Sequence, residues 1–233
     1  GAETCARYKM MVDYHGICKP TGLQRTYPNV INYEGVHGLE NMKWAANTYD
    51  MPLYDVTIPF VRMVAGPMDY TQGAMLNAIR KNYAPINTEP MSQGTRCHQL
   101  ATYVIFESPL NMLCDNPSNY RREAECTEFI ADIPTVWDKT VALDGKIGEY
   151  VAIARHHGDN WYVGALTNWD AREVEIDLSF LGDGSYKMEL FRDGINADRA
   201  ARDYKKEIIP VPADRKVKVQ MAPGGGWAAK IYR

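Results

Sequence analysis

The chain has 233 residues, of which 45% are hydrophobic and 24% charged, and its formal net charge is -3. This composition is typical of a globular protein, and the weak charge with scattered basic residues argues against a nucleic-acid-binding surface. No apolar run approaches the roughly 18 residues of a membrane span, and no basic segment precedes an apolar one at the start. We therefore expect neither nucleic acid nor membrane as a partner.

Up to about Pro134, short apolar runs alternate with segments of helical spacing, a rhythm typical of βα units. Strands are expected over 9–13, 58–64 and 111–114, and helices over 68–83 and 93–106. The last helix of this half is expected to be capped by Asp115 or Asn116, with Pro117 at its first position. Three βα units cannot close a (β/α)8 barrel, which takes about 250 residues, so we expect a longer enzyme.

From about Trp137 the pattern changes to an alternation of period two. Val174, Ile176 and Leu178 alternate with charged residues, which predicts a strand with one buried and one exposed face. Residues 157–160 are expected to form a hairpin turn. Further turns are expected at 181–184, 192–194 and 212–214. This half, residues 135–233, is therefore predicted to be an antiparallel β-sandwich.

The most informative part of the chain follows the apolar run at 10–12. A polar loop begins there and runs on to two glutamates, with a density of charged and polar residues too high for a linker. The residues that mark it are Asp13, His15, Lys19, Arg25, Glu34 and Glu40. In a barrel enzyme the chemistry lies where strands end, so we expect a functional site in this loop.

The same segment, MVDYHGICKPTGLQRTYPNVINYEGVHGLE at residues 11–40, resembles the region around the sixth barrel strand of glycoside hydrolase family 97, the calcium-dependent α-glucoside and α-galactoside hydrolases. Further matches lie at 55–60, 66–73, 106–110 and 223–227, so the resemblance covers essentially the whole chain. It implies that residues 1–134 are the C-terminal part of a (β/α)8 TIM barrel, about strands 6–8, and that residues 135–233 are the β-sandwich that follows it.

The resemblance also assigns roles to individual residues. Glu40 matches the general acid of the family, Glu34 matches a calcium ligand, and Glu40 is expected close enough to contact the metal as well. His15 matches a histidine that contacts the sugar. Calcium takes several oxygen ligands, so the others are expected upstream of this chain. Without the resemblance, glutamates in a polar loop are mostly solvated, and a strand-end histidine is more often structural.

One departure from the family pattern bears on stereochemistry. In the inverting branch a glutamate follows the strand-end histidine and acts as the base, whereas this chain has Gly16 there. The resemblance therefore implies the retaining branch, whose nucleophile, an aspartate on an earlier barrel strand, would lie upstream. Because glycoside hydrolysis needs two such groups, the chain alone is expected to be inactive. The predicted function is calcium-dependent, retaining hydrolysis of terminal α-galactosides, with an α-glucosidase as the alternative.

Several residues are expected to have lesser roles. Asp13 is expected to face the barrel lumen beside the site, and Asp69 to cap a helix rather than reach the pocket. Trp161, Trp169 and Trp227 are expected in the sandwich core. A non-catalytic carbohydrate-binding or structural fragment remains the rival hypothesis, and the structural role is preferred because no cluster of outward-facing aromatic residues is evident.

The five cysteines are well separated, which argues against a zinc site and favours buried free thiols. The family resemblance implies a periplasmic location, where a disulfide could form, and Cys114 with Cys126 is the candidate pair. The oligomeric state is left open.

Overall fold

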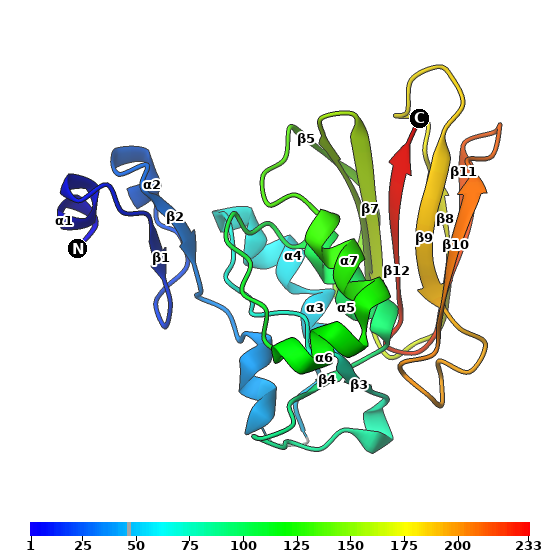
Figure 1. The fold of residues 1–233 in the computed structure, drawn as a ribbon, viewed down its shortest axis with the longest axis horizontal. Coiled ribbons are helices and arrows are strands. Elements are labelled where there is room, and N and C mark those ends of the chain that lie inside the picture. The colour runs from blue at the N-terminus through cyan, green and yellow to red at the C-terminus, as the bar shows by residue number, and fades with distance from the viewer. Residues whose placement is uncertain (46–47) are drawn as a thin grey trace.

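The computed structural model describes residues 1–45 and 48–233 (Figure 1). The α-helices are α1 (Ala2–Arg7), α2 (Leu23–Thr26), α3 (Met51–Asp55), α4 (Ile58–Val61), α5 (Arg96–Ile105), α6 (Pro117–Arg122) and α7 (Ala124–Asp132), and the 3₁₀ helices are η1 (Leu39–Lys43), η2 (Met63–Ala65) and η3 (Arg80–Asn82). The first strands are β1 (Val12–Tyr14), β2 (Val30–Tyr33), β3 (Leu76–Ala78) and β4 (Met91–Gln93). The later strands are β5 (Lys139–Lys146), β6 (Tyr150–His157), β7 (Asn160–Thr167), β8 (Arg172–Asp177), β9 (Lys187–Asp193), β10 (Tyr204–Pro210), β11 (Lys216–Met221) and β12 (Gly226–Tyr232).

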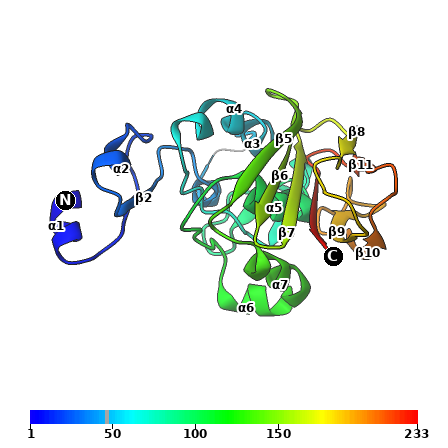
Figure 2. The ribbon, with the colours of Figure 1, turned by 90° about the horizontal axis from the view of Figure 1, so that it is seen from above.

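The first half contains two separate pairs of parallel strands. β1 pairs with β2, and β3 pairs with β4. The first pair lies with α1 and α2 to one side of the body of the molecule, as both views show (Figures 1 and 2). Within the described residues the two pairs do not join into one sheet. The fold is therefore mixed α/β with mostly antiparallel strands, and these residues contain no closed barrel.

The second half is an antiparallel sandwich, as predicted. Six strands form one sheet in the order β10-β9-β12-β7-β6-β5, and β8 and β11 pair with each other. The apolar residues that alternate along β8, such as Val174 and Ile176, join a core cluster with Val163 and Met188 of the large sheet. The predicted hairpin is confirmed, since β6 and β7 pair up to His157 and Asn160.

The other face of the six-stranded sheet is covered by α5, all of whose residues are buried. The predicted helix over 93–106 is thus confirmed, and Thr95 caps it by accepting a hydrogen bond from the His98 N–H at 3.1 Å. Gly164 of β7 lets the helix approach closely, because a Cβ there would lie 3.0 Å from the Ala101 carbonyl oxygen. The helix therefore joins the sandwich to the first half through one continuous core.

A buried polar network also crosses this junction. The His98 ring lies 3.0 Å from Asp55 Oδ2 through Nε2 and 3.1 Å from the Gly225 carbonyl oxygen through Nδ1. The Tyr70 hydroxyl donates to the other oxygen of Asp55. All three side chains are fully buried, so the network fixes α3, α5 and the turn before β12 relative to one another.

Three predicted elements are wrong. Residues 58–64 form α4 and η2 instead of a strand, because Pro59 stands at the start of α4, where a missing N–H breaks no helical hydrogen bond. The helix over 68–83 is absent, because Thr71 and Gly73 have φ values of 59° and 104°, which a right-handed helix excludes. Residues 111–114 form no strand, and only the Asn111 side chain and the Cys114 N–H bond to Gln72.

The remaining expectations for the first half have mixed outcomes. The Asn116 side chain accepts from the Asn119 N–H and so caps α6, with Pro117 at its first turn, as predicted. All five cysteines are free thiols, so Cys114 and Cys126 are not bonded. No helix in the described part of the chain is both long and apolar enough to span a membrane.

Candidate functional site

The first parallel pair places two of the predicted residues at one edge. Because β1 and β2 run in the same direction, their carboxyl ends lie together, and His15 and Glu34 follow directly after them. The Glu34 N–H donates to the Tyr14 carbonyl oxygen at 2.8 Å, which extends the pairing by one residue. The site thus begins where the sequence predicted it.

Glu40 and Asp69 reach the same edge from two later segments. Glu40 lies in the first turn of η1, and its N–H donates to Thr71 Oγ1 at 3.1 Å. Asp69 follows η2 in an extended segment, where its N–H donates to the Tyr33 carbonyl oxygen at 2.9 Å. These backbone contacts fix both carboxylates next to the end of β2.

The His15 ring lies at the centre of this cluster. Its Nδ1 is 2.8 Å from Asp69 Oδ2, and its Nε2 is 3.1 Å from Glu40 Oε1 and 3.7 Å from Glu34 Oε1. Ligand atoms of His15, Glu34 and Glu40 all lie within 4.8 Å of one another. The structure therefore brings together the three residues predicted for the site and adds Asp69, whose predicted role as a helix cap is wrong.

The electrostatics of the cluster follow from its three carboxylates. The hydrogen bond to Asp69 raises the pKa of His15 from 6.5 to about 9, with further contributions from Glu34 and Glu40 and an opposing effect of burial. Burial, together with the neighbouring Asp69, raises the pKa of Asp13 from 3.8 to about 6. An imidazolium at His15 thus compensates the negative charge of the three carboxylates around it.

Arg62 holds the loops of the site in place, a role that no pattern in the sequence predicted. Its buried guanidinium donates to five carbonyl oxygens at 2.9 to 3.1 Å. Those oxygens belong to Tyr33, Glu34, Gly35, Gly66 and Pro67. The segment that carries Glu34 and the segment that carries Asp69 are therefore tied to one side chain.

The donor set fits a hard cation in part. Glu34 Oε1 and Glu40 Oε1 both face His15 Nε2, so the two carboxylates converge on a position where positive charge is stabilised. Carboxylate oxygens are the ligands that Ca²⁺ prefers, and it takes six to eight of them. The backbone N–H of Gly16 also donates to Glu34 Oε2, which orients that carboxylate. Glu34 and Glu40 are therefore two carboxylates that could contribute oxygen ligands to such a cation.

Comparison with known families matches both ends of the chain. Residues 136–232 match the family described as glycosyl-hydrolase 97 C-terminal, oligomerisation, and residues 1–36 match glycoside hydrolase 97. The second match includes His15 and Glu34 at the ends of β1 and β2. The first match spans the strands of the sandwich from just before β5 to the end of β12.

Individual relatives agree with these matches. A Bacteroides thetaiotaomicron protein named retaining alpha-galactosidase is 64% identical over 230 residues, which cover 99% of this chain and 35% of that protein. A solved glycoside hydrolase family 97 enzyme from a Pseudoalteromonas species, in complex with acarbose, has a TM-score of 0.89 and 34% identity over 99% of this chain and 36% of that one. A solved beta-arabinopyranosidase has a TM-score of 0.83 and 28% identity, and the match covers 98% of this chain and 35% of that one.

The chain therefore spans about a third of the length of these relatives. The matches at both ends, the relative that is 64% identical across nearly every residue, and the fold shared with a solved family member all agree. The chain belongs to glycoside hydrolase family 97.

Proposed function

We propose that this chain supplies the general acid/base and part of the calcium site of a retaining α-galactosidase. The observation that carries the proposal is the convergence of Glu40, Glu34 and His15 at the ends of β1 and β2. The relative named retaining alpha-galactosidase supports the choice of sugar and stereochemistry. Gly16, which stands where the inverting branch carries a glutamate, agrees with retention.

The geometry supports the proposed chemical roles. In retaining hydrolysis one carboxyl group protonates the leaving oxygen and then deprotonates the attacking water. Glu40 takes this role because its side chain is partly exposed, while Glu34 is nearly buried. His15, oriented by Asp69, contacts Glu40 from one side, and its match to a sugar-contacting histidine of the family supports a role in binding a sugar hydroxyl. The nucleophile comes from the part of the enzyme outside this chain.

When bound, calcium would supply positive charge that stabilises negative charge developing on the leaving oxygen. Glu34 and Glu40 would hold it, together with oxygen ligands from the rest of the enzyme. Arg62 keeps Glu34 in place through the backbone of residues 33–35.

The two parallel strand pairs are best explained as part of a (β/α)8 barrel, about strands 6–8, that the rest of the enzyme completes. Parallel sheets are normally covered on both faces, whereas all three residues of β1 are only partly buried here, in contrast to the mostly buried β2. Apolar side chains are exposed in the same half of the chain, among them Met10, Met11, Trp44, Leu110, Met112 and Leu113. Residues 1–134 then belong to the catalytic barrel and residues 135–233 to the sandwich, and we expect no activity from the chain alone.

An α-glucosidase is the second candidate. It is favoured by the similarity to the Pseudoalteromonas enzyme solved in complex with acarbose, at 34% identity. The higher identity to the galactosidase, 64%, favours the first candidate. The two candidates differ in the sugar and share the site.

The experiment is hydrolysis of aryl α-galactoside and aryl α-glucoside by the full-length enzyme, with the anomer of the first product followed by NMR. We expect cleavage of the galactoside with α-galactose released first, and loss of activity on chelation that calcium restores. Preference for the glucoside would establish the second candidate. Release of the β-anomer would refute retention.

A further inference from the structure

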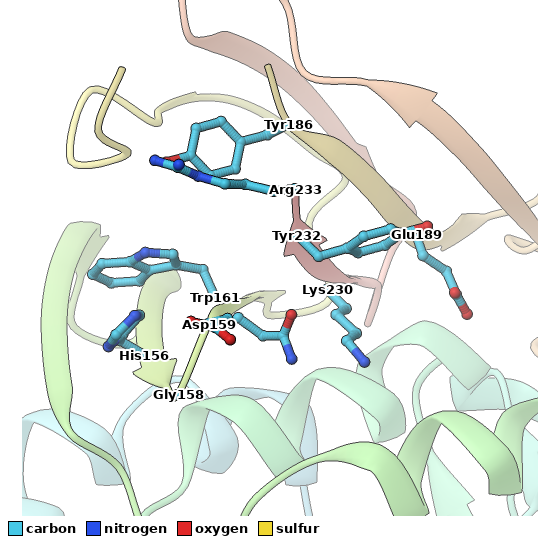
Figure 3. Close-up of a pocket in the computed structure, with 10 residues that line it drawn as sticks. His156, Gly158, Asp159, Trp161, Tyr186, Glu189, Lys230, Tyr232 and Arg233 are labelled. Atoms are coloured by element: carbon cyan, nitrogen blue, oxygen red, sulfur yellow. The ribbon is translucent and has the colours of Figure 1, made fainter. Parts of the chain in front are cut away.

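A cavity lies at one end of the sandwich, away from the cluster around His15. It has a volume of about 720 Å³ and opens between the β6–β7 hairpin and the ends of β9 and β12 (Figure 3). In Figure 1 this end of the sandwich lies near the C-terminus, on the right, whereas β1 and β2 lie on the left. Its volume falls within the roughly 300 to 1,000 Å³ that small-ligand sites occupy.

Aromatic side chains line the cavity on several sides. Trp161 packs against Phe180 and His156, with ring centroids 4.4 and 4.7 Å apart, and both Trp161 and Tyr232 are only partly buried. Figure 3 shows Trp161 and Tyr232 on different sides of the opening. Trp161, which was predicted to lie in the sandwich core, is thus only partly buried and lines the cavity, whereas Trp227 is buried as predicted.

Two of the charged groups that line the cavity, Lys230 and Glu189, each form an ion pair. Lys230 Nζ lies 2.7 Å from Asp132 Oδ2, and Glu189 Oε1 lies 3.0 Å from Lys206 Nζ. Arg233 donates to the Tyr186 hydroxyl at 3.2 Å and covers that ring. The other two, Asp159 and Arg233, have opposite signs, so the cavity carries little net charge to attract an ionic ligand.

The hairpin turn adds polar groups with capacity for further hydrogen bonds. Asp159 is exposed and Asn160 half-buried, and both line the cavity. Figure 3 shows Asp159 between Trp161 and Lys230. Neither side chain takes part in a protein hydrogen bond or ion pair within residues 1–45 and 48–233. A carboxylate here also disfavours phosphate and other anions.

We propose that this cavity is a second carbohydrate-binding site, separate from the cluster around Glu40. A neutral sugar ring matches its chemistry, because the apolar face of the ring stacks on aromatic side chains while its hydroxyls bond to amide and carboxylate groups. Purely apolar ligands would leave Asp159 and Asn160 desolvated and unpaired. The sugar is either an α-galactoside related to the substrate or an α-glucan.

The test uses the full-length enzyme labelled with 5-fluorotryptophan, in which the resonance lost on Trp161→Phe identifies Trp161. Raffinose and maltotriose are titrated separately, so that the arms distinguish an α-galactoside from an α-glucoside. A Glu40→Gln background prevents turnover. We expect one of the two sugars to shift the Trp161 resonance in a saturable way. The sugar that does so shows whether the ligand of the cavity is an α-galactoside or an α-glucan.

Two variants that spare the Trp161 packing serve as probes. Tyr232→Ala and Asp159→Ala are each expected to weaken the binding reported by Trp161 about fivefold, the effect of losing one stacking or hydrogen-bonding contact. Asp170→Ala removes an exposed acid outside the cavity and is expected to leave binding unchanged. The proposal is overturned if neither sugar shifts the resonance at tens of millimolar, or if both cavity variants bind like the parent protein.

Discussion

Asp69 Oδ2 and His15 Nδ1 lie 2.8 Å apart, and this contact aims the opposite nitrogen of the ring at Glu40. The Asp69 side chain is fully buried, whereas His15 is partly exposed. The buried Asp69 carboxylate thus orients the accessible His15 ring, as carboxylates that hydrogen-bond to metal-binding histidines do. Asp69 is therefore a positioning residue in our account, although the sequence indicated a helix cap.

Replacing Asp69 is expected to lower kcat without unfolding the enzyme. Asp69→Ala leaves His15 free to rotate, and we expect kcat to fall between about tenfold and hundredfold, as for other residues that orient a ligand or catalytic group. Asp69→Asn retains an oxygen that can accept from Nδ1, so its loss should be smaller. Steady-state kinetics and thermal melting of both variants check this, and equal losses for Asn and Ala would contradict the orienting role.

Arg62→Lys is expected to destabilise the first half. A lysine ammonium cannot reach the five carbonyl oxygens that the guanidinium now satisfies, so buried acceptors lose their partners. We expect the free energy of unfolding to fall by about 3 kcal/mol in urea denaturation. Arg25→Lys, at an exposed arginine, serves as the control. Equal stability of the two variants would show that the five contacts do not matter.

Asp193 predicts a pH dependence of stability in the sandwich. Burial raises its pKa from 3.8 to about 6, although hydrogen bonds from the N–H groups of Ala222 and Gly226 oppose the shift. The folded state then binds more protons than the unfolded state between these values, so stability falls as the pH rises through that window. Across the whole window, this shift of the Asp193 pKa lowers the free energy of unfolding by roughly 3 kcal/mol.

Asp193→Asn is expected to remove this dependence. The amide keeps an oxygen for the two N–H groups but does not ionise, so its stability relative to wild type should rise by roughly 3 kcal/mol across the window from pH 3.8 to about 6. Asp193→Ala loses the acceptor too and should be less stable than the asparagine variant at every pH. Urea denaturation at several pH values measures this, and parallel profiles for wild type and Asp193→Asn would be the contrary result.

Gly164 tests the packing of α5 on the sheet. A methyl group there would lie 3.0 Å from the Ala101 carbonyl oxygen and from Ile105 Cγ1, so Gly164→Ala should destabilise the protein by about 2 kcal/mol. Gly182→Ala is the matched control, because a Cβ there meets its nearest neighbour at an ordinary 3.7 Å. If the two variants melt at the same temperature, the helix and sheet are not as closely packed as described.

The sequence predicted the sandwich better than the first half for a physical reason. Burial alternates along β8 because one face of the strand is exposed to solvent and the other is buried. The matching alternation of polar and apolar residues is visible in the sequence alone. In the first half, the short apolar runs at 58–64 and 111–114 have no such period. Pro59 favours the start of α4 in place of the first predicted strand, and the left-handed backbone of Thr71 excludes the predicted helix over 68–83. The conformation of Thr71 depends on tertiary contacts, which the sequence does not reveal.

The site was only partly predictable. Glu34, Glu40 and His15 follow from a family resemblance and lie together in the structure. Asp69 and Arg62 act through contacts between segments far apart in the chain, which no local pattern reveals. The calcium requirement, the catalytic roles and the periplasmic location stay predictions.

The most direct test of the central claim is the Glu40→Gln variant of the full-length enzyme on two α-galactosides, one with an activated aryl leaving group and one with a sugar leaving group. Glu175→Gln, at an exposed glutamate of β8, is the control. If Glu40 is the general acid/base, kcat/KM on the sugar leaving group falls by about 10³ and much less on the aryl galactoside, whose leaving group needs little protonation. Equal losses on the two substrates, or activity like that of Glu175→Gln, would contradict the assignment.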